Sequence, residues 1–387
     1  MNVATLGEVT DLITDGTHAS PLRTPTGVPV LSAQNVKGGR LLTQTNRFTS
    51  EAELSAFEKR VTPQKGDVLL TIVGTIGRAA ILDERPSAVF QRSVAVIRPS
   101  ATRLDGRYLL HVTQSRDFQE QMRRSTNQSS QAGIYLAKLR ALTLPLPPLD
   151  QQRRIAAILD QADALRAKRR QCLAHLDSLT RSIASEALSP VLAESSDAVL
   201  GDIADVLTGF AFPSARFVAE GVRLCRGANV LPGRLDWSDL RCWSSDEVRG
   251  LDRFALSEGD IVLALDRPWI TEGQKMARVS KVDLPSLLVQ RVARIRASSE
   301  EFQGLIWAAL SSPSFQRHCR PTETTIPHIS PVELRNYPIH VPSPPALSRL
   351  HATTSALETQ RSAATRELAE MEELFASLQS RAFKGEL

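Results

Sequence analysis

The feature that most constrains the fold of this chain is a repeat of its own sequence. Residues 6–41 align with residues 200–235 without a gap, and twelve of the 36 aligned pairs are identical. Chance at ordinary amino-acid usage would give about two or three identities. The match continues with small slips, for example between KGDVLL (65–70) and EGDIVL (258–263). The sequence therefore predicts a tandem duplication of one unit about half the length of the chain.

Composition narrows the class of protein. Hydrophobic residues make up 42% and charged residues 23%, the balance of a soluble globular protein. This excludes a mostly disordered chain, a collagen-like fibre and a membrane bundle. The N-terminus lacks the profile of a signal peptide, and the four dispersed cysteines form no CxxC pair, so we expect a cytoplasmic protein with reduced thiols.

Each copy divides into a strand-rich part and a helical part. Residues 1–148 and 198–345 contain short apolar runs, such as GDVLLTIVG and GDIVLAL, separated by Gly and Pro turns, and these predict buried strands. Residues 149–197 and 346–387 each contain a long helix. The predicted fold class is α+β: two tandem mixed α/β domains separated by two long helices.

Both long helices carry apolar residues on steps of three and four. In the first helix the seam includes Ile155, Ile158, Ala162, Leu165, Cys172, Leu176, Leu179 and Ile183. Thr354 and Arg361 interrupt the seam of the second. Because an isolated helix of this length is unstable in water, we expect the two to pair as an intramolecular antiparallel coiled coil with pseudo-two-fold symmetry.

Positive charge is concentrated in the first strand-rich part. Residues 1–148 carry 18 Lys and Arg against 12 Asp and Glu, whereas residues 198–345 carry 17 of each. If the chain binds a polyanion, we therefore expect the first part to contribute more of the salt-dependent binding affinity than the second.

Four motifs together resemble a known family. They are LGEVTDLITDGTH (6–18), GVPVLSAQNV (27–36), KGDVLLTIVGTIGRAAIL (65–82) and, most specifically, IYLAKLRALTLPLPPLDQQRRIAAIL (134–159). With them, and with its tandem copy, the chain resembles the DNA specificity subunit of Type I restriction–modification systems over essentially its whole length. The second copy departs from the pattern, because VPSPPALSRLHATTSAL lacks the Gln-Gln-Arg-Arg of the first, which would weaken partner contacts on that side.

The resemblance implies a function without catalysis in this chain. Each strand-rich part would be a target recognition domain that reads one half of a split sequence in double-stranded DNA. The helices would set the spacing and bind two methyltransferase subunits. Those subunits would use S-adenosylmethionine, and motor–nuclease subunits with ATP and Mg would join them for cleavage.

Sequence reading requires polar side chains that reach base edges, so the candidates lie in polar loops. In the first copy they are Thr17, His18, Arg23, Gln34, Asn35, Lys37, Thr75, Arg78, Gln91, Arg92, Ser125, Thr126, Asn127, Gln128 and Ser129. In the second copy they are Arg226, Asn229, Arg267, Trp269, Gln274, Lys275, Gln290, Arg291, Arg320, Thr322, Thr324, Thr325 and His328.

Comparison of the copies ranks these candidates. The run RRSTNQSSQ (123–131) and its counterpart RPTETTIPH (320–328) differ, and they are therefore better candidates for reading different half-sites. Asn35 and Asn229 match between the copies, as do the Gln-Arg pairs at 91–92 and 290–291. A match favours a shared structural or phosphate-binding role. For the helices, Ile155, Leu159, Leu173 and Leu368 are the candidates for methyltransferase contact, with coiled-coil core as the alternative.

Three other functions remain open. The chain could belong to a related restriction system that cuts beside its site, or be an architectural coiled-coil adaptor that reads no sequence. It could also be an enzyme with an unrecognised site, although GxxxxGK[ST] is absent. Asp260, Asp266 and Glu272 lie close in sequence, but Gln274 stands where a nuclease lysine would be expected. We therefore predict no catalytic residue and no metal site.

Overall fold

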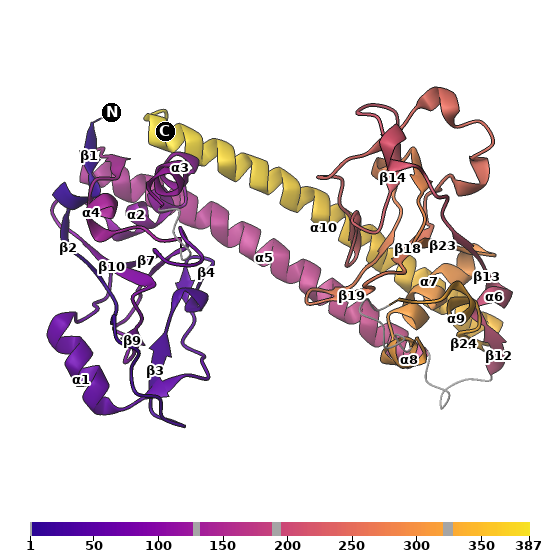
Figure 1. Cartoon of the computed structure of the whole chain (residues 1–387), viewed down its shortest axis with the longest axis horizontal. Coiled ribbons are helices and arrows are strands. Elements are labelled where there is room, and N and C mark those ends of the chain that lie inside the picture. The colour runs from indigo at the N-terminus through magenta and orange to yellow at the C-terminus, as the bar shows by residue number, and fades with distance from the viewer. Residues whose placement is uncertain (1, 127–131, 188–194, 320–327) are drawn as a thin grey trace. The chain divides into compact units, whose positions relative to one another are not determined.

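A computed structural model describes residues 2–126, 132–187, 195–319 and 328–387 (Figure 1). The chain forms two compact units. Unit 1 comprises Met1–Arg170 and Arg366–Leu387, and unit 2 comprises Gln171–Thr365. Each unit therefore joins one strand-rich part to portions of both long helices, whereas the sequence placed boundaries at 148 and 345.

The first copy of the repeat contains short strands, short helices and one long helix. Its elements are β1 (Val3–Thr5), η1 (Leu6–Glu8), β2 (Thr10–Asp15), β3 (Val28–Leu31), η2 (Ala33–Asn35), β4 (Val36–Lys37), β5 (Arg40–Leu41), β6 (Phe48–Thr49), α1 (Glu51–Arg60), β7 (Val68–Thr71), β8 (Ala79–Ile81), β9 (Val89–Phe90), β10 (Val94–Pro99), α2 (Gly106–Thr113), α3 (Arg116–Ser125), α4 (Leu136–Arg140), β11 (Thr143–Pro145) and α5 (Leu149–Ala187).

The second copy repeats the order of the main strands, adds β19 and β20, has short 3-10 helices in place of α1, and differs in its other short helices. Its elements are β12 (Ser195–Val199), α6 (Leu200–Ile203), β13 (Ala204–Thr208), η3 (Ser214–Arg216), β14 (Val222–Cys225), β15 (Val230–Leu231), β16 (Arg234–Leu235), β17 (Cys242–Trp243), η4 (Ser245–Glu247), η5 (Asp252–Phe254), β18 (Ile261–Ala264), β19 (Trp269–Ile270), β20 (Gly273–Gln274), β21 (Met276–Arg278), η6 (Lys281–Asp283), β22 (Ser286–Leu288), β23 (Val292–Ala297), α7 (Glu300–Leu310), α8 (Pro313–His318), α9 (Pro331–Arg335), β24 (Pro338–Pro342) and α10 (Pro344–Lys384).

The sheets of the two copies have the same strand order. A four-stranded sheet runs β2-β10-β7-β8 in the first copy and β13-β23-β18-β21 in the second. A three-stranded sheet runs β6-β3-β9 and β17-β14-β22. The central strands β7 and β18 are buried along their whole length, which confirms the strands predicted from GDVLLTIVG and GDIVLAL. The mixed helix and strand content is that of an α+β fold.

A buried ion pair occupies the same place in both four-stranded sheets. Arg98 on β10 donates two hydrogen bonds, of 2.9 and 2.8 Å, to the carboxylate of Asp67. In the second copy Arg296 donates bonds of 2.7 and 2.8 Å to Asp260. The carboxylates are 2% and 1% exposed. Each pair therefore fixes the start of the central strand to the strand beside it.

The structure corrects the gapless alignment of the copies. Arg98 pairs with Leu12 and Pro99 with Thr10, so Asp11 bulges out of β2. In the second copy Arg296 pairs with Asp205 and Ala297 with Ala204, without a bulge. Because Arg98 and Arg296 are equivalent, the Asp11/Asp205 identity joins residues at different places in the fold.

The two long helices pack antiparallel within unit 1. Arg170 forms an ion pair of 2.8 Å with Glu372, and the guanidinium of Arg166 lies 4.1 Å from the centre of the Phe375 ring. Gln151, near the start of α5, donates a hydrogen bond to the carbonyl of the C-terminal Leu387. Among the described residues no helix is both long enough and apolar enough to span a bilayer.

Unit 2 contains a second antiparallel contact between the same helices. Arg361 on α10 donates a 2.9 Å hydrogen bond to Asp177 on α5 and another of 3.0 Å to the carbonyl of Gly233. The arginine that interrupts the apolar seam therefore ties both helices to the turn between β15 and β16. The seam prediction was wrong at Leu165 and Leu179, which are 50% and 47% exposed, and at Cys172, which is also exposed.

Candidate nucleic-acid interface

In unit 1, several of the predicted loops meet at one end of the four-stranded sheet, where β2 and β7 finish and β10 begins. We call this end of the sheet the edge. The backbone N–H of Thr17 donates to the carbonyl of Phe90 at 2.7 Å, and that of Arg92 donates to Thr17 at 3.0 Å. Ile72 donates to the carbonyl of Ser93 at 2.9 Å. The loop after β2, the turn before β10 and the loop after β7 are thus neighbours. This edge brings together the candidates Thr17, Thr75, Arg78, Gln91 and Arg92.

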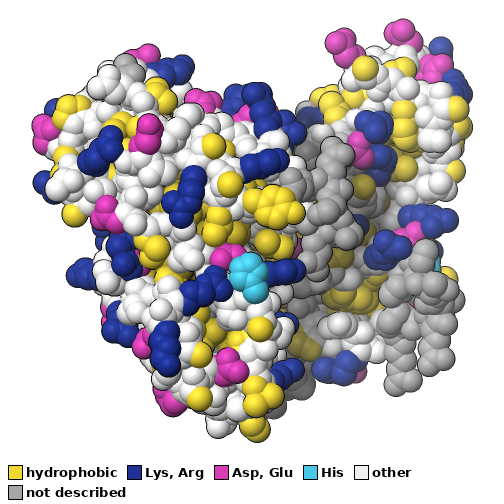
Figure 2. Space-filling view, turned by 60° about the vertical axis from the view of Figure 1, so that its left-hand side comes forward, with side chains coloured by type: hydrophobic (Ala, Val, Ile, Leu, Met, Phe, Trp, Pro, Cys, Tyr) yellow, Lys and Arg dark blue, Asp and Glu magenta, His cyan; other side chains and the backbone are white. Residues whose placement is uncertain are grey.

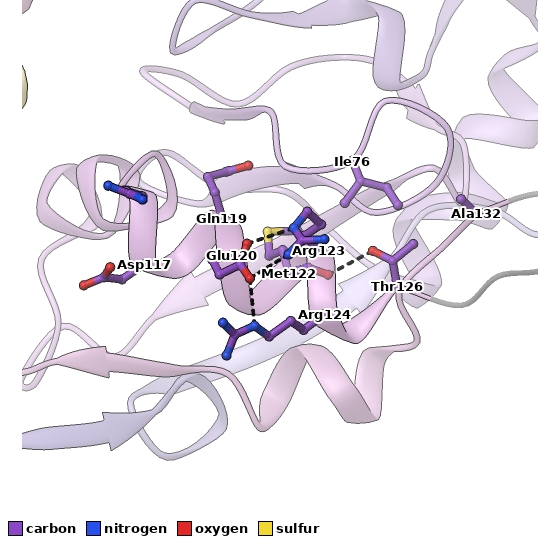
Figure 3. A pocket seen from close by; sticks show the side chains of 10 residues that line it. Ile76, Asp117, Gln119, Glu120, Met122, Arg123, Arg124, Thr126 and Ala132 are labelled. Carbon is purple, nitrogen blue, oxygen red and sulfur yellow. Dashed lines mark hydrogen bonds and ion pairs between the residues drawn. The ribbon is translucent and has the colours of Figure 1, made fainter.

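The end of α3 reaches the same edge. A hollow is lined by Ile76 from the loop after β7, by α3 residues from Arg116 to Arg124, and by Thr126 and Ala132 (Figure 3). Gly74 donates a backbone hydrogen bond to Ala132 at 3.3 Å. Ser125 and Thr126 therefore lie beside the other edge candidates. Asn127, Gln128 and Ser129 lie outside the described residues.

Glu120 holds two arginines at the wall of this hollow. Its carboxylate accepts bonds of 2.8 and 2.7 Å from Arg123 and one of 2.8 Å from Arg124 (Figure 3). These bonds lower the pKa of Glu120 from 4.5 to about 2. A lowered pKa means that the ion pairs persist above pH 4.5 and are lost only as the pH falls toward 2. Arg123 and Arg124 therefore stay paired at neutral pH.

A second polar hollow in unit 1 gathers Gln34, Asn35 and Lys37 with Gln44, Asn46 and Arg47. Asn35 has a structural role there, because its carbonyl oxygen accepts from Ser32 N–H at 3.0 Å and its amide donates to Leu42 at 3.0 Å. Arg23 reaches the carbonyl of Asn46 at 3.5 Å. His18 lies 3.0 Å from Asp15 and is largely exposed.

In unit 2, the loops equivalent to the unit 1 edge meet around Asp266. Its carboxylate accepts from Arg291 at 2.6 Å and from His328 at 2.7 Å. Burial opposes the charge, yet these two hydrogen bonds hold the pKa of Asp266 below its usual value. The backbone N–H of Gln290 donates to Phe210 at 2.8 Å. This second edge therefore includes Gln290, Arg291 and His328.

The β19–β20 hairpin adds further candidates near Asp266. Arg267 is exposed at its start, and Trp269 packs toward Phe315 with ring centres 6.4 Å apart. Lys275 donates to the carbonyl of Gly227, and its pKa is lowered, chiefly by burial. Gln274 is half-buried and pairs with Trp269 across the hairpin. Arg320, Thr322, Thr324 and Thr325 fall outside the part of the chain that the structure describes.

Two candidates of the second copy have partners inside unit 2. Asn229 is 1% exposed, and its amide donates to the carbonyl of Asp236 at 2.9 Å. Arg226 is occupied by Asp239, with an ion pair of 2.9 Å, and by the Asn229 carbonyl oxygen. Both residues stabilise the loop after β16. The match of Asn35 with Asn229 therefore reflects a shared turn.

The Gln-Arg match at 91–92 and 290–291 is also offset by one residue. Val94 donates to the carbonyl of Gln91, and Val292 donates to that of Val289. Gln91 is thus equivalent to Val289, and Arg92 to Gln290. The arginine of the second pair, Arg291, has no arginine at its place in the first copy, so the two pairs do not share one role.

The helix residues predicted to contact a partner divide into two groups. Ile155 and Leu159 are 1% and 0% exposed and belong to the core of unit 1, so their prediction as partner contacts was wrong. Leu173 and Leu368 are half-buried. Leu374, which the sequence analysis did not select, is 59% exposed on α10. A strict heptad count does not reveal which leucines the strand-rich part covers.

Within the Gln-Gln-Arg-Arg of α5, Gln152 bonds inside unit 1, whereas Arg153 and Arg154 are exposed. Gln152 is fully buried, accepts from the N–H of Asp105 at 2.9 Å, and donates to the carbonyls of Arg103 and Pro147. It ties α5 to the strand-rich part of its own unit.

The surface of unit 1 is rich in positive charge. Figure 2 shows lysine and arginine side chains spread over the forward face of this unit, with acidic side chains between them.

The two aspartates of unit 2 that lie close in sequence do not share a site. Asp260 pairs with Arg296, whereas Asp266 pairs with Arg291. Across the described residues, no group of three His, Cys, Asp or Glu side chains is placed to hold a metal ion.

Comparison with known proteins adds an independent finding. Residues 1–174 match the family model described as Type I restriction modification DNA specificity domain. The chain is 40% identical over 139 residues to the Type I restriction enzyme EcoAI specificity subunit of Escherichia coli, covering 35% of this chain and 23% of that protein. It is 26% identical over 219 residues to the MjaVIII specificity subunit of Methanocaldococcus jannaschii, covering 52% of each.

Solved structures show a similar fold. The crystal structure of a Type I restriction–modification system S subunit from M. genitalium matches with a TM-score of 0.58 and 14% identity, over 99% of this chain and 96% of that one. A chain from a structure of Type I R-M complex assembly matches with a TM-score of 0.51 and 16% identity, over 100% and 98%. The chain spans about a quarter to a half of the length of the two curated relatives.

Proposed function

We propose that the chain is the DNA specificity subunit of a Type I restriction–modification complex, because residues 1–174 match the family model of the Type I restriction modification DNA specificity domain. One observation carries the proposal beyond the matched residues. The same order of strands occurs twice, and each time polar loops meet at the same edge of the four-stranded sheet. Each edge would read one half of a split target in double-stranded DNA.

The long helices support the second part of the proposal. Antiparallel contacts between α5 and α10 occur in unit 1 and again in unit 2, as an intramolecular coiled coil requires. We propose that this coiled coil sets the spacing of the half-sites and binds two methyltransferase subunits. Leu173, Leu368 and Leu374 are the candidates for that contact.

The chemistry would reside in other subunits. We propose that the methyltransferase partners use S-adenosylmethionine, that motor–nuclease partners use ATP and Mg, and that this chain supplies no catalytic residue. The complex would act in the cytoplasm. A related system that cuts beside its site would need the same specificity subunit with a different partner.

Methylome sequencing tests the proposal directly. A host would express the full chain together with its methyltransferase subunit, and modified bases would be mapped across the genome. We expect modified adenines in one split, asymmetric motif. No modification, with the methyltransferase shown to be active, would favour an architectural adaptor, and a short continuous motif would mean that only one unit reads DNA.

Glu120 offers a second prediction about DNA affinity. Replacing Glu120 with glutamine removes the carboxylate that holds Arg123 and Arg124. Non-specific DNA affinity should rise several-fold at low salt, because two arginines become available to phosphates. The slope of log affinity against log salt should steepen by about one to two. Fluorescence anisotropy with a duplex that lacks the target would measure both quantities.

A matched control separates this effect from net charge. Glu51→Gln removes one negative charge from the first turn of α1 and frees no arginine. If Glu51→Gln and Glu120→Gln changed affinity and salt slope equally, pairing with Glu120 would not restrain DNA binding by these arginines.

A further inference from the structure

Three segments that are far apart in sequence meet at the Asp266 carboxylate. Asp266 follows β18, Arg291 lies in the turn before β23, and His328 precedes α9. Arg291 donates to one carboxylate oxygen at 2.6 Å and the His328 ring approaches the other at 2.7 Å. The backbones of Asp266 and His328 also form an isolated β-bridge. The side chain of Asp266 is 26% exposed, whereas that of Arg291 is 68% exposed.

The first copy builds the same edge without this cluster. Ile72 donates to the carbonyl of Ser93 as Leu265 donates to that of Arg291, so Arg291 takes the place of Ser93. Val73 forms an isolated bridge with Gly133, as Asp266 does with His328. The three places therefore hold Val73, Ser93 and Gly133 in unit 1. Because unit 1 folds the edge with small or apolar residues there, the fold does not require the charged cluster.

Two arginines at this edge hold a backbone conformation that residues with a Cβ atom disfavour. Arg267 has φ +47° and Arg291 has φ +66°, and they are the only non-glycine residues with positive φ in the described part of the chain. The place of Arg267 is taken in unit 1 by Gly74, with φ +78°. Both arginine side chains are exposed, so packing does not explain the strain. Strain of this kind collects at functional sites.

We propose that Asp266 is a positioning residue that, with His328, holds Arg291 in the orientation that reads a guanine in the half-site of unit 2. The inference rests on the proposed function and deepens it. An arginine reads guanine through two parallel N–H donors to O6 and N7. The bond to Asp266 uses one terminal nitrogen, and the Arg291 side chain as a whole is 68% exposed. A guanidinium fixed by a carboxylate loses less freedom on binding than a free one.

The test uses the full chain with its methyltransferase subunit and compares methylomes. In Arg291→Ala, one G·C position in one half of the motif should accept any base, while the other half stays unchanged. Asp266→Asn should relax the same position, and Asp266→Glu should restore part of the discrimination. The wild-type motif is measured in parallel, so a split wild-type motif that no variant alters would overturn this inference and leave the proposed function intact.

Two further variants separate base reading from folding. Arg241→Ala removes an exposed arginine of unit 2 that pairs with Asp239 at 3.1 Å and not with Asp266, and it should leave the motif unchanged. Arg267→Gly installs the residue of the first copy and relieves strain. Protection of the β18 amides of this variant from hydrogen exchange should be equal or higher while its DNA affinity falls several-fold. A stabilised Arg267→Gly variant with undiminished affinity would contradict a functional reason for the strain.

Discussion

Replacement of Asp67 with alanine is expected to lower the stability of unit 1 by about 3 kcal/mol. Removing one partner of a buried ion pair costs about 3–5 kcal/mol, and the lower figure applies because the Arg98 side chain is 26% exposed. The variant also leaves the N–H of Gln64 without its 2.8 Å acceptor. Two compact units do not unfold as one two-state system. Hydrogen exchange of the β7 and β10 amides is therefore the appropriate measurement, with β18 and β23 as the internal reference.

Asp83→Ala is the matched control for this experiment. Asp83 also pairs with an arginine, Arg107, but its side chain is 73% exposed and the ion pair is 3.2 Å long. Its loss should change stability by no more than about 0.5 kcal/mol. Equal protection of β7 in the two variants would show that the Asp67–Arg98 pair does not stabilise the sheet.

Exchange of residues 1–148 for those of a relative with a different target should replace one half of the methylated motif and leave the other half unchanged. Each wrong base pair costs about 1–3 kcal/mol of binding, so a half-site that differs at several positions should no longer be modified. Gln152, beyond the exchange point, bonds only to backbone groups of the exchanged segment. These bonds do not depend on the side chains exchanged, whereas those of Asp160 do, because Asp160 pairs with the side chains of Arg107 and His111.

The exchange has a clear contradictory outcome. If both halves of the motif changed, or neither did, the two copies would not read separate half-sites. A folded hybrid is established first by thermal unfolding, because an unfolded hybrid would also lose modification. We expect the half of the motif that the unexchanged copy reads to stay the same, and the other half to change to that of the donor relative.

Much of the fold was predictable because it depends on local patterns. The apolar runs that became β7 and β18 are too hydrophobic for an exposed strand, and α5 and α10 occupy the spans without internal breakers. The features that the sequence did not reveal depend on where individual residues lie in the folded structure. The bulge at Asp11 shifts one strand by a residue, which no count of identities can detect. By sequence, Arg361 only interrupts the apolar seam of the helix. In the structure it donates hydrogen bonds to Asp177 and Gly233.

The candidate interface was predicted in outline and corrected in detail. Polarity and turn residues located the loops that meet at each edge, since such residues rarely fill a core. The same criterion selected Asn229, because asparagine serves buried turns as well as ligands. Asp266 was considered only as a poor metal ligand. Its bonds to Arg291 and His328, which lie 25 and 62 residues away in sequence, form only in the folded unit.

The repeated Asp–Arg pair has a consequence for how such chains diverge after duplication. The partners are 31 residues apart in the first copy and 36 apart in the second. The connecting segment, which carries the loops of the edge and in one copy an additional hairpin, has thus changed in length while its two ends stayed joined. Insertions and deletions between the partners leave the sheet as it was. A lineage can therefore acquire new loop lengths, and with them new targets, without evolving a new fold.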